Sequence, residues 1–446
     1  MKLDRPLNPM QLAFHYLGKL VNPNSGELLT LAGPLDVSIL RQAIQSAVSR
    51  HPLLNSTPIT KYGKPYWRES QHPLPIDLQI RSTRKRKESS VVTELLTNLW
   101  NETLPADGRQ VKFIYTKGPQ RSYLQICAPH TVTDAWSGTR LAADIASAYS
   151  AIAKGERWSA KASRPIERKI KDVFLSRLST SQKLGVAYDT SRHLVRDILE
   201  PGAGLELGKG NRSAPTALSI TRVPKALLGN TLTQARRHGV TAHALFLLAL
   251  TRARTEMVSQ SDPQLFRIND FASLRPFADR DVREVFDVLV VPNQLTIDPN
   301  WDDQTALKIL SGRLKYQKQR GVFSELYRLS LYGKLGRLLP TRLTAQIVFK
   351  FINKTDIAVT NPGRVPWQDE LERFGDVPVL DFINFPHLLP PSKAVLIFTT
   401  FRDELRIVQL YDPSLLPDGL GQTLVEPLVK HLERLVQALA HTETSI

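Results

Sequence analysis

The sequence predicts a mixed α/β or α+β fold built from two subdomains. Short strand-like runs alternate with amphipathic helical stretches along most of the 446 residues, a pattern typical of this fold class. A chain of this length exceeds one simple core, so two units are expected. From about residue 155 the sequence becomes basic and later glycine-rich. We therefore expect a first subdomain over 1–160, a basic connector over 161–215 and a second subdomain over 216–446.

In the first half, strands and helices are expected to alternate. The helix predicted over 37–50 is the clearest, because its apolar residues recur at helical spacing. The other expected elements are strands at 28–33, 65–68, 110–116 and 122–128, and helices at 91–101 and 135–149.

Helices and strands are also expected in the connector and in the second half. Helical segments are expected over 173–199, and an apolar helix over 241–255 whose first residue, Thr241, can cap its N-terminus. A hairpin turn is predicted at Arg402 and Asp403. The remaining expected elements are strands at 217–223, 265–271, 286–297, 355–360, 394–401 and 404–409, and helices from 224 and over 421–439.

The composition restricts the class of protein. A hydrophobic content of 42% with 23% charged residues is ordinary for a globular enzyme. No apolar run is long enough to predict a transmembrane span, and the first residues do not resemble a signal peptide, so a cytoplasmic location is expected. The single cysteine, Cys127, excludes a disulfide framework and a cysteine-cluster metal site. No metal is expected.

The net charge of +17 indicates an attraction for anions. Nucleic acid, an anionic membrane, coenzyme A and an acidic carrier protein are all candidates. No helix-turn-helix, zinc-finger or RNA-binding signature accompanies the basic residues, which makes nucleic acid the weakest of them. Basic residues cluster at 81–87 and 164–171, where they fit solvated loops or a positively charged entrance for an anionic substrate.

The strongest functional signal is His130 followed by Asp134. The strand-like run 123–128 leads to His130, Pro129 precedes it, and a helix-like stretch follows. A histidine at a strand end is held in place without being buried, which suits a general base. Asp134 is close enough to brace the same loop, or to orient the base as in a hydrolase triad.

The segment 129–135 resembles the HHxxxDG motif of the condensation-domain and chloramphenicol-acetyltransferase-like acyltransferase superfamily. Pro129 replaces the first His of that motif and Ala135 its Gly. Further landmarks of the superfamily match in order along nearly the whole chain, namely Arg50-His51-Pro52-Leu53-Leu54, 235–241, Ser273-Leu274-Arg275-Pro276, 291–295 and Thr360-Asn361-Pro362-Gly363. The DFGWG-type sequence of the plant branch of this superfamily is absent, and the segment 381–385 is only distantly similar to it. This favours the condensation or alcohol-acyltransferase branch.

The resemblance implies two chloramphenicol-acetyltransferase-like subdomains in a V with a central tunnel. It implies a free-standing acyltransferase that moves an acyl group from a thioester to a hydroxyl or amine, forming an ester or amide, in secondary metabolism and natural product biosynthesis. His130 is then the general base, and Asp134 pairs with Arg275 to support the active-site loop. Further tunnel residues are expected to be Trp136, Ser137, Asn361, Gly363, Asn384 and His387.

The same resemblance implies the partners. The donor is an acyl group on coenzyme A or on an acidic acyl or peptidyl carrier protein, and the acceptor is a small alcohol or amine. No other cofactor is expected, and the chain is expected to be a monomer. Two alternatives stay open: a catalytically silent module of the same fold used for docking, and a basic membrane-binding or nucleic-acid-binding protein.

Overall fold

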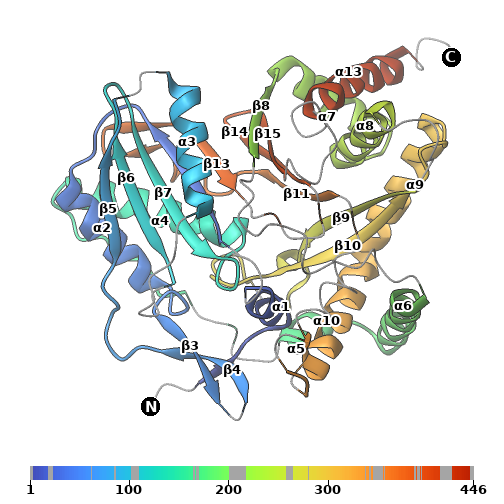
Figure 1. The fold of residues 1–446 in the computed structure, drawn as a ribbon, viewed down its shortest axis with the longest axis horizontal. Coiled ribbons are helices and arrows are strands. Elements are labelled where there is room, and N and C mark those ends of the chain that lie inside the picture. Colours follow the sequence, from blue (N-terminus) through green and yellow to red (C-terminus); the bar gives the residue numbers. More distant parts are fainter. Residues whose placement is uncertain are drawn as a thin grey trace.

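The structure is a computed structural model. It describes residues 4–18, 24–61, 63–84, 87–101, 110–163, 166, 170–199, 217–257, 265–279, 281–336, 338–340, 343–344, 355, 357–385, 388, 392, 394–411 and 424–441. Two six-stranded sheets form two lobes that stand side by side (Figure 1). The predicted mixed fold and two-lobed architecture are confirmed.

The first lobe contains the sheet with the strand order β12-β13-β2-β7-β6-β5. Its strands are β2 (Asn24–Leu31), β5 (Asp77–Ser82), β6 (Lys112–Lys117), β7 (Ser122–Pro129), β12 (Arg373–Phe374) and β13 (Val377–Phe385). Leu29 and Leu31 of β2 enter the core with α2 (Val37–Arg50) and α4 (Ala135–Ala153). Leu28, which points to the opposite face, packs with α3 (Glu88–Asn101).

The second lobe contains the sheet with the strand order β10-β9-β11-β14-β15-β8. Its strands are β8 (Ala217–Val223), β9 (Phe266–Ser273), β10 (Val290–Ile297), β11 (Ile357–Arg364), β14 (Ala394–Phe401) and β15 (Glu404–Tyr411). The helices on it are α7 (Lys225–Arg237), α8 (Ala242–Met257), α9 (Asp303–Tyr316) and α13 (Val425–His441). Thr241 Oγ1 accepts a hydrogen bond from the Ala244 amide, which confirms the predicted cap of α8.

The pairing of strands crosses the predicted boundary between the halves. β13 belongs to the C-terminal half of the sequence, yet it pairs with β2 in the first lobe, with Asn384 opposite Glu27. The segment before β10 also reaches across, since Phe286 and Leu289 lie in the first core. The boundaries 1–160 and 216–446 stay a prediction for folding units, but the second half of the chain contributes β12 and β13 to the first sheet.

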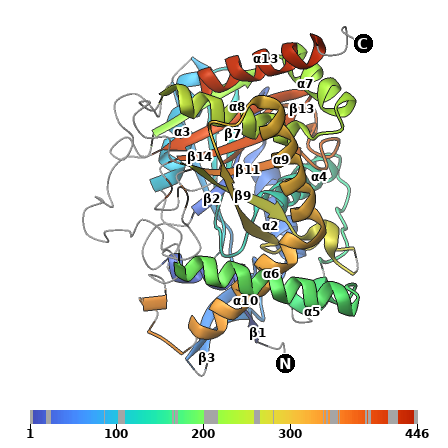
Figure 2. The ribbon, with the colours of Figure 1, turned by 90° about the vertical axis from the view of Figure 1, so that its right-hand side faces the viewer.

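The connector region carries α5 (Ile170–Leu175) and α6 (Thr180–Leu199), and Figure 2 shows α6 alongside α10 (Val322–Gly336). A fully buried ion cluster joins these helices: Arg328 contacts Asp197 at 2.5 Å and Glu325 on its own helix. Removing one charge of such a cluster would leave the others buried and unpaired, which costs about 3–5 kcal/mol.

The sequence did not predict several elements. They are the helices α1 (Pro9–Leu17), α9 and α10 and the strands β1 (Arg5–Pro6), β3 (Ser56–Lys61), β5, β12 and β13. β1 and β3 form a small sheet with β4 (Lys64–Glu69), which matches the strand expected at 65–68. α1 begins with a capping box between Asn8 and Gln11. Among the described helices, none has the length and apolar character to cross a bilayer.

Candidate active site

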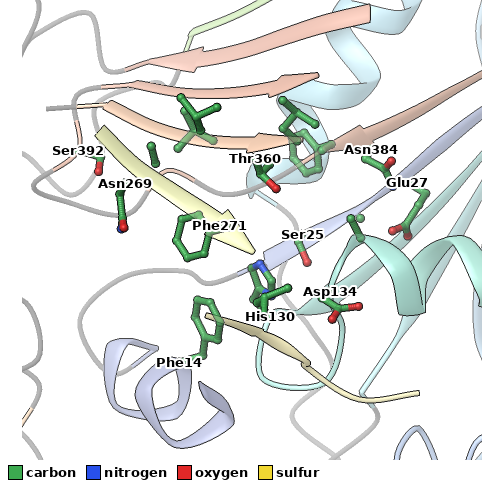
Figure 3. Close-up of a pocket in the computed structure, with 18 residues that line it drawn as sticks. Phe14, Ser25, Glu27, His130, Asp134, Asn269, Phe271, Thr360, Asn384 and Ser392 are labelled. Atoms are coloured by element: carbon green, nitrogen blue, oxygen red, sulfur yellow. The ribbon is translucent and has the colours of Figure 1, made fainter. Parts of the chain in front are cut away.

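His130 follows the last residue of β7, a strand paired on both sides within the first sheet. Its Nδ1 lies 2.6 Å from the Thr133 carbonyl oxygen, and its ring stacks on Phe14 with centroids 4.2 Å apart. A carbonyl can only accept, so Nδ1 carries the hydrogen and the lone pair of the neutral ring is on Nε2. Figure 3 shows the half-buried ring standing over Phe14 at the wall of a cavity.

Burial lowers the pKa of His130, and the charge of Asp134 opposes this effect only in part. The imidazole is therefore neutral near pH 7, the form that can accept a proton. The Thr133 contact thus sets the tautomer, and burial sets the protonation state.

Asp134 is the N-cap of α4, and its carboxylate is turned toward the second lobe. Arg275 donates to it twice, at 2.7 and 3.1 Å, and the amides of Ser137 and Leu289 each donate at 2.9 Å. Burial by itself raises the pKa of Asp134, but Arg275 and these hydrogen bonds outweigh it and lower the pKa. The predicted contact between Asp134 and Arg275 is present.

Arg275 extends this link between the lobes. Besides Asp134 it donates to Ser137 Oγ at 2.9 Å and to the carbonyl oxygen of Asp287 at 3.0 Å. The side chains of both Asp134 and Arg275 are 2% exposed. The pair therefore holds the His130 turn against the segment that precedes β10.

The cavity beside His130 lies between the two sheets and has a volume of about 800 Å³, including the space open to solvent at its mouth. Its lining comes from α1, β2 and the His130–Asp134 turn of the first lobe, from β13, and from strands of the second lobe. The lining residues are Phe14, Ser25, Gly26, Glu27, His130, Asp134, Ala135, Asn269, Phe271, Val290, Ala358, Val359, Thr360, Asn384, Phe385, Ser392, Val395 and Ile397. Most of this surface is apolar, with a few polar groups that can orient a ligand.

No protein-family model matches the chain. Among curated proteins, it is 32% identical over 154 residues to the probable non-canonical nonribosomal peptide synthetase CymA of Salinispora arenicola, covering 34% of this chain. It is 24% identical over 467 aligned positions to a linear gramicidin synthase from Brevibacillus parabrevis, covering 99% of this chain. The chain spans only 2% and 6% of the length of these relatives.

Solved structures resemble it over almost its full length. The first condensation domain of the CDA synthetase superposes with a TM-score of 0.71 at 16% identity, covering 98% of this chain and 96% of that one. The epimerization domain of tyrocidine synthetase B gives 0.69 at 16% identity, with 98% of both chains covered. A starter condensation domain of rhizomide synthetase, in complex with C8-CoA, gives 0.66 at 15% identity, with 98% and 95% covered.

The chain has the condensation-domain fold. This is the fold that the sequence resemblance implied. Because condensation and epimerization domains share this architecture, the fold by itself does not fix the reaction. The residues around the cavity have to carry the functional argument.

The condensation fold brings only some of the predicted site residues to this cavity. His130, Asp134 and Asn384 line it, and His387 is outside the described residues. Trp136 and Ser137 do not line it. Ala135 faces the cavity, and two helical residues further the side chain has turned by about 200°, so Ser137 is buried against the Asp287 backbone.

The residues of the landmark Asn361-Pro362-Gly363 also lie outside the cavity lining. Asn361 binds His243 Nδ1 at 3.2 Å and accepts from the Gly363 amide at 3.0 Å, at an irregular point of β11. Gly363 has a φ of 74°, which favours glycine there. Thr360, one residue earlier, lines the cavity instead.

The landmark Arg50-His51 lies away from the cavity and has a structural role. His51 is completely buried, and its Nε2 lies 2.7 Å from Asp144 Oδ2. Arg50 contacts the other oxygen of Asp144 at 2.5 Å. These contacts tie the end of α2 to α4, the helix that begins at Asp134.

Two important lining residues were not predicted, Phe14 and Glu27. Phe14 lies on α1, which the sequence did not predict. Glu27 is the one charged residue of the fully buried strand β2, and that acid beside Leu28 and Leu29 was the available signal. Burial, and next the charge of Asp134, raise the pKa of Glu27 to about 8. Within the described part of the chain, no His, Cys, Asp and Glu side chains group as a metal site.

Proposed function

We propose that the protein is a condensation-type acyltransferase that transfers an acyl group from a thioester to a hydroxyl or amine acceptor. The observation that carries this proposal is His130: its Nδ1 is engaged by the Thr133 carbonyl, and its ring borders a largely apolar cavity between the lobes. This is the arrangement that a general base needs, with a fixed tautomer and access to the substrate.

In the proposed reaction, His130 Nε2 accepts the proton of the acceptor as its oxygen or nitrogen attacks the thioester carbonyl. The tetrahedral intermediate then collapses, the carbon–sulfur bond breaks, and the imidazolium returns the proton to the departing thiolate. General base catalysis contributes about 10²–10⁴-fold to such a rate. Holding both substrates in one cavity contributes further by orientation.

The donor is proposed to be acyl coenzyme A or an acyl group on an acidic carrier protein. The net charge of +17 favours either anion. The C8-CoA complex of the rhizomide synthetase domain supports a coenzyme A thioester in this fold. Donor KM is then expected to rise with salt, because surface charges are screened beyond about 8–10 Å.

The decisive experiment measures thiol release and product mass with a panel of acyl-CoA donors and simple alcohols and amines. His130→Ala is expected to lower turnover about 10²–10⁴-fold while the fold is retained by circular dichroism. The control is Glu433→Gln, an exposed position on α13. Turnover in His130→Ala equal to the wild type would remove the mechanism. Donor binding without any turnover would instead favour a silent docking module.

A further inference from the structure

Glu27 is a buried carboxyl of the cavity that the proposed acyl transfer does not use. It lies in the middle of β2, is 3% exposed, and lines the cavity together with Asn384 on the neighbouring strand. Figure 3 shows Glu27 and Asn384 at the same end of the cavity, with Asp134 below them. The remainder of the lining is mostly apolar, so this end is chemically distinct.

The helix that faces Glu27, α4, has a glycine at the point where it meets the carboxyl, and the missing side chain leaves room for this group. A Cβ placed on Gly138 of α4 would lie 1.8 Å from Glu27 Oε1 and 2.4 Å from its Cδ. Glycine weakens the interior of a helix, so helix formation does not explain it here. The space that it leaves is filled by the Glu27 carboxyl, which places this group at the cavity wall.

Among the described residues, no cationic side chain forms an ion pair with Glu27. His130 and Asp134 border the same cavity, and Asp134 already has Arg275 as its partner. β7 carries no charged residue. On the other elements packed around β2, Arg140 and Asp144 of α4 bind each other and Asp381 of β13 binds Arg222 and Arg406. Glu94 of α3, on the opposite face of the sheet, is exposed.

Asn384 adds a second polar group. Its Nδ2 is buried and has no hydrogen-bond acceptor of normal geometry among the described residues. Its amide nonetheless lies close enough to Glu27 to act against the rise in the pKa of that carboxyl, and the effect of burial is larger. A buried amide hydrogen without an acceptor is costly, and a ligand oxygen in the cavity would satisfy it.

We propose that Glu27 is the specificity-determining residue of this cavity and binds a basic nitrogen of the substrate, a primary amine or a similar cation. Asn384 then donates to an oxygen next to that nitrogen. The inference rests on the proposed function, because it takes the cavity as the substrate site. Its physical basis is that a carboxylate buried without a counter-ion is strongly disfavoured, whereas a cationic ligand supplies the missing charge.

Binding is expected to be linked to proton release. With the pKa of Glu27 raised to about 8, the carboxyl is mostly protonated at pH 7. An alkylammonium ion favours the ionised form, so its binding releases close to one proton at pH 7 and few protons above about pH 9. Its affinity should therefore increase with pH up to about 8, while the affinity of a neutral alcohol stays flat.

The test is titration calorimetry of the whole chain with hexylamine and with hexan-1-ol. Measurements at pH 7 in phosphate and in Tris, which differ in ionisation enthalpy, give the number of protons released. Hexylamine is expected to bind about tenfold or more tightly than hexanol. Glu27→Gln keeps the shape, and it should abolish both the preference and the proton release while hexanol affinity stays unchanged. Glu433→Gln, the same change on the surface, should abolish neither.

A second variant tests the placement of the carboxyl without removing it. Gly138→Ala is expected to displace the Glu27 side chain and to reduce the preference for hexylamine. Equal affinity of the wild type for hexylamine and hexanol, or an amine preference that persists in Glu27→Gln, would overturn the proposal. Loss of acyl transfer with intact amine binding would instead count against the proposed function alone, since binding is measured without a donor.

Discussion

Asp134 and Glu27 are two carboxyls at one cavity with opposite protonation behaviour. Asp134 receives two hydrogen bonds from Arg275 and two from backbone amides, and the balance lowers its pKa. Glu27 is equally buried but has no cation partner among the described ion pairs, and its pKa is raised to about 8. Burial acts in the same direction on both, so the difference lies in their partners.

The comparison separates a structural charge from a ligand-binding one. Asp134 is saturated, and its charge fastens the His130 turn to the second lobe. Glu27 is held neutral at pH 7 and can ionise when a cation arrives. A carboxyl that already has its counter-ion stabilises the fold, whereas a carboxyl that lacks one is available to a substrate.

The largest expected effect on stability comes from removing Asp134, the carboxyl that has all its partners. Asp134→Ala leaves Arg275 buried without its partner, which should lower the free energy of unfolding by about 3–5 kcal/mol. Urea denaturation at pH 7 measures this. Combining Asp134→Ala with Arg275→Met, which removes the orphaned charge, should recover part of the loss. A stability change below about 1 kcal/mol would show that the pair does not hold the loop.

Gly138→Ala tests the space beside Glu27. Helix propensity alone would stabilise the protein by about 1 kcal/mol, but the new methyl group collides with the carboxyl. Overpacking of this kind costs about 1–3 kcal/mol, so the net effect is expected to be destabilising. Adding Glu27→Ala should remove the collision and make Gly138→Ala stabilising. If the single variant raises the melting temperature, Glu27 does not occupy this position.

The pH dependence of stability should distinguish the two carboxyls. The pKa of Glu27 is raised from 4.5 to about 8, so the folded state holds more protons than the unfolded state between these values. Its contribution then declines as pH rises through this window, by at most about 1.4 kcal/mol per unit. Asp134 acts oppositely, since its stabilisation is lost only as pH falls below the ordinary range of aspartate. Comparing wild type with Glu27→Gln from pH 5 to 8 isolates the first slope, and parallel curves would contradict it.

The smallest effect on stability is expected for a carboxylate on the protein surface. Glu426 pairs with Lys430 one helical turn away at 3.0 Å, and both side chains are more than half exposed. Glu426→Gln should change the free energy of unfolding by at most about 0.5 kcal/mol. Urea denaturation at low and moderate salt measures it, and a change comparable to that of Asp134→Ala would mean that partners and burial do not set the scale.

The sequence by itself predicted the elements whose signals are local. The apolar spacing over 37–50 predicted α2, and Thr241 predicted the start of α8. The motif resemblance predicted that Asp134 would contact Arg275, although 141 residues separate them. Neither periodicity nor spacing contains that information, because a contact between distant segments follows from the whole fold.

The tertiary structure alone decided the composition of the cavity. Glu27 and Asn384 become neighbours because β13 crosses from the C-terminal half into the first sheet, and strand pairing over such a distance leaves no local pattern. Gly138 could be identified as the space for Glu27 only once β2 and α4 were packed together. The residues able to do chemistry are written in the sequence, but their protonation depends on which charges the fold brings near them, and that is a property of the packed molecule.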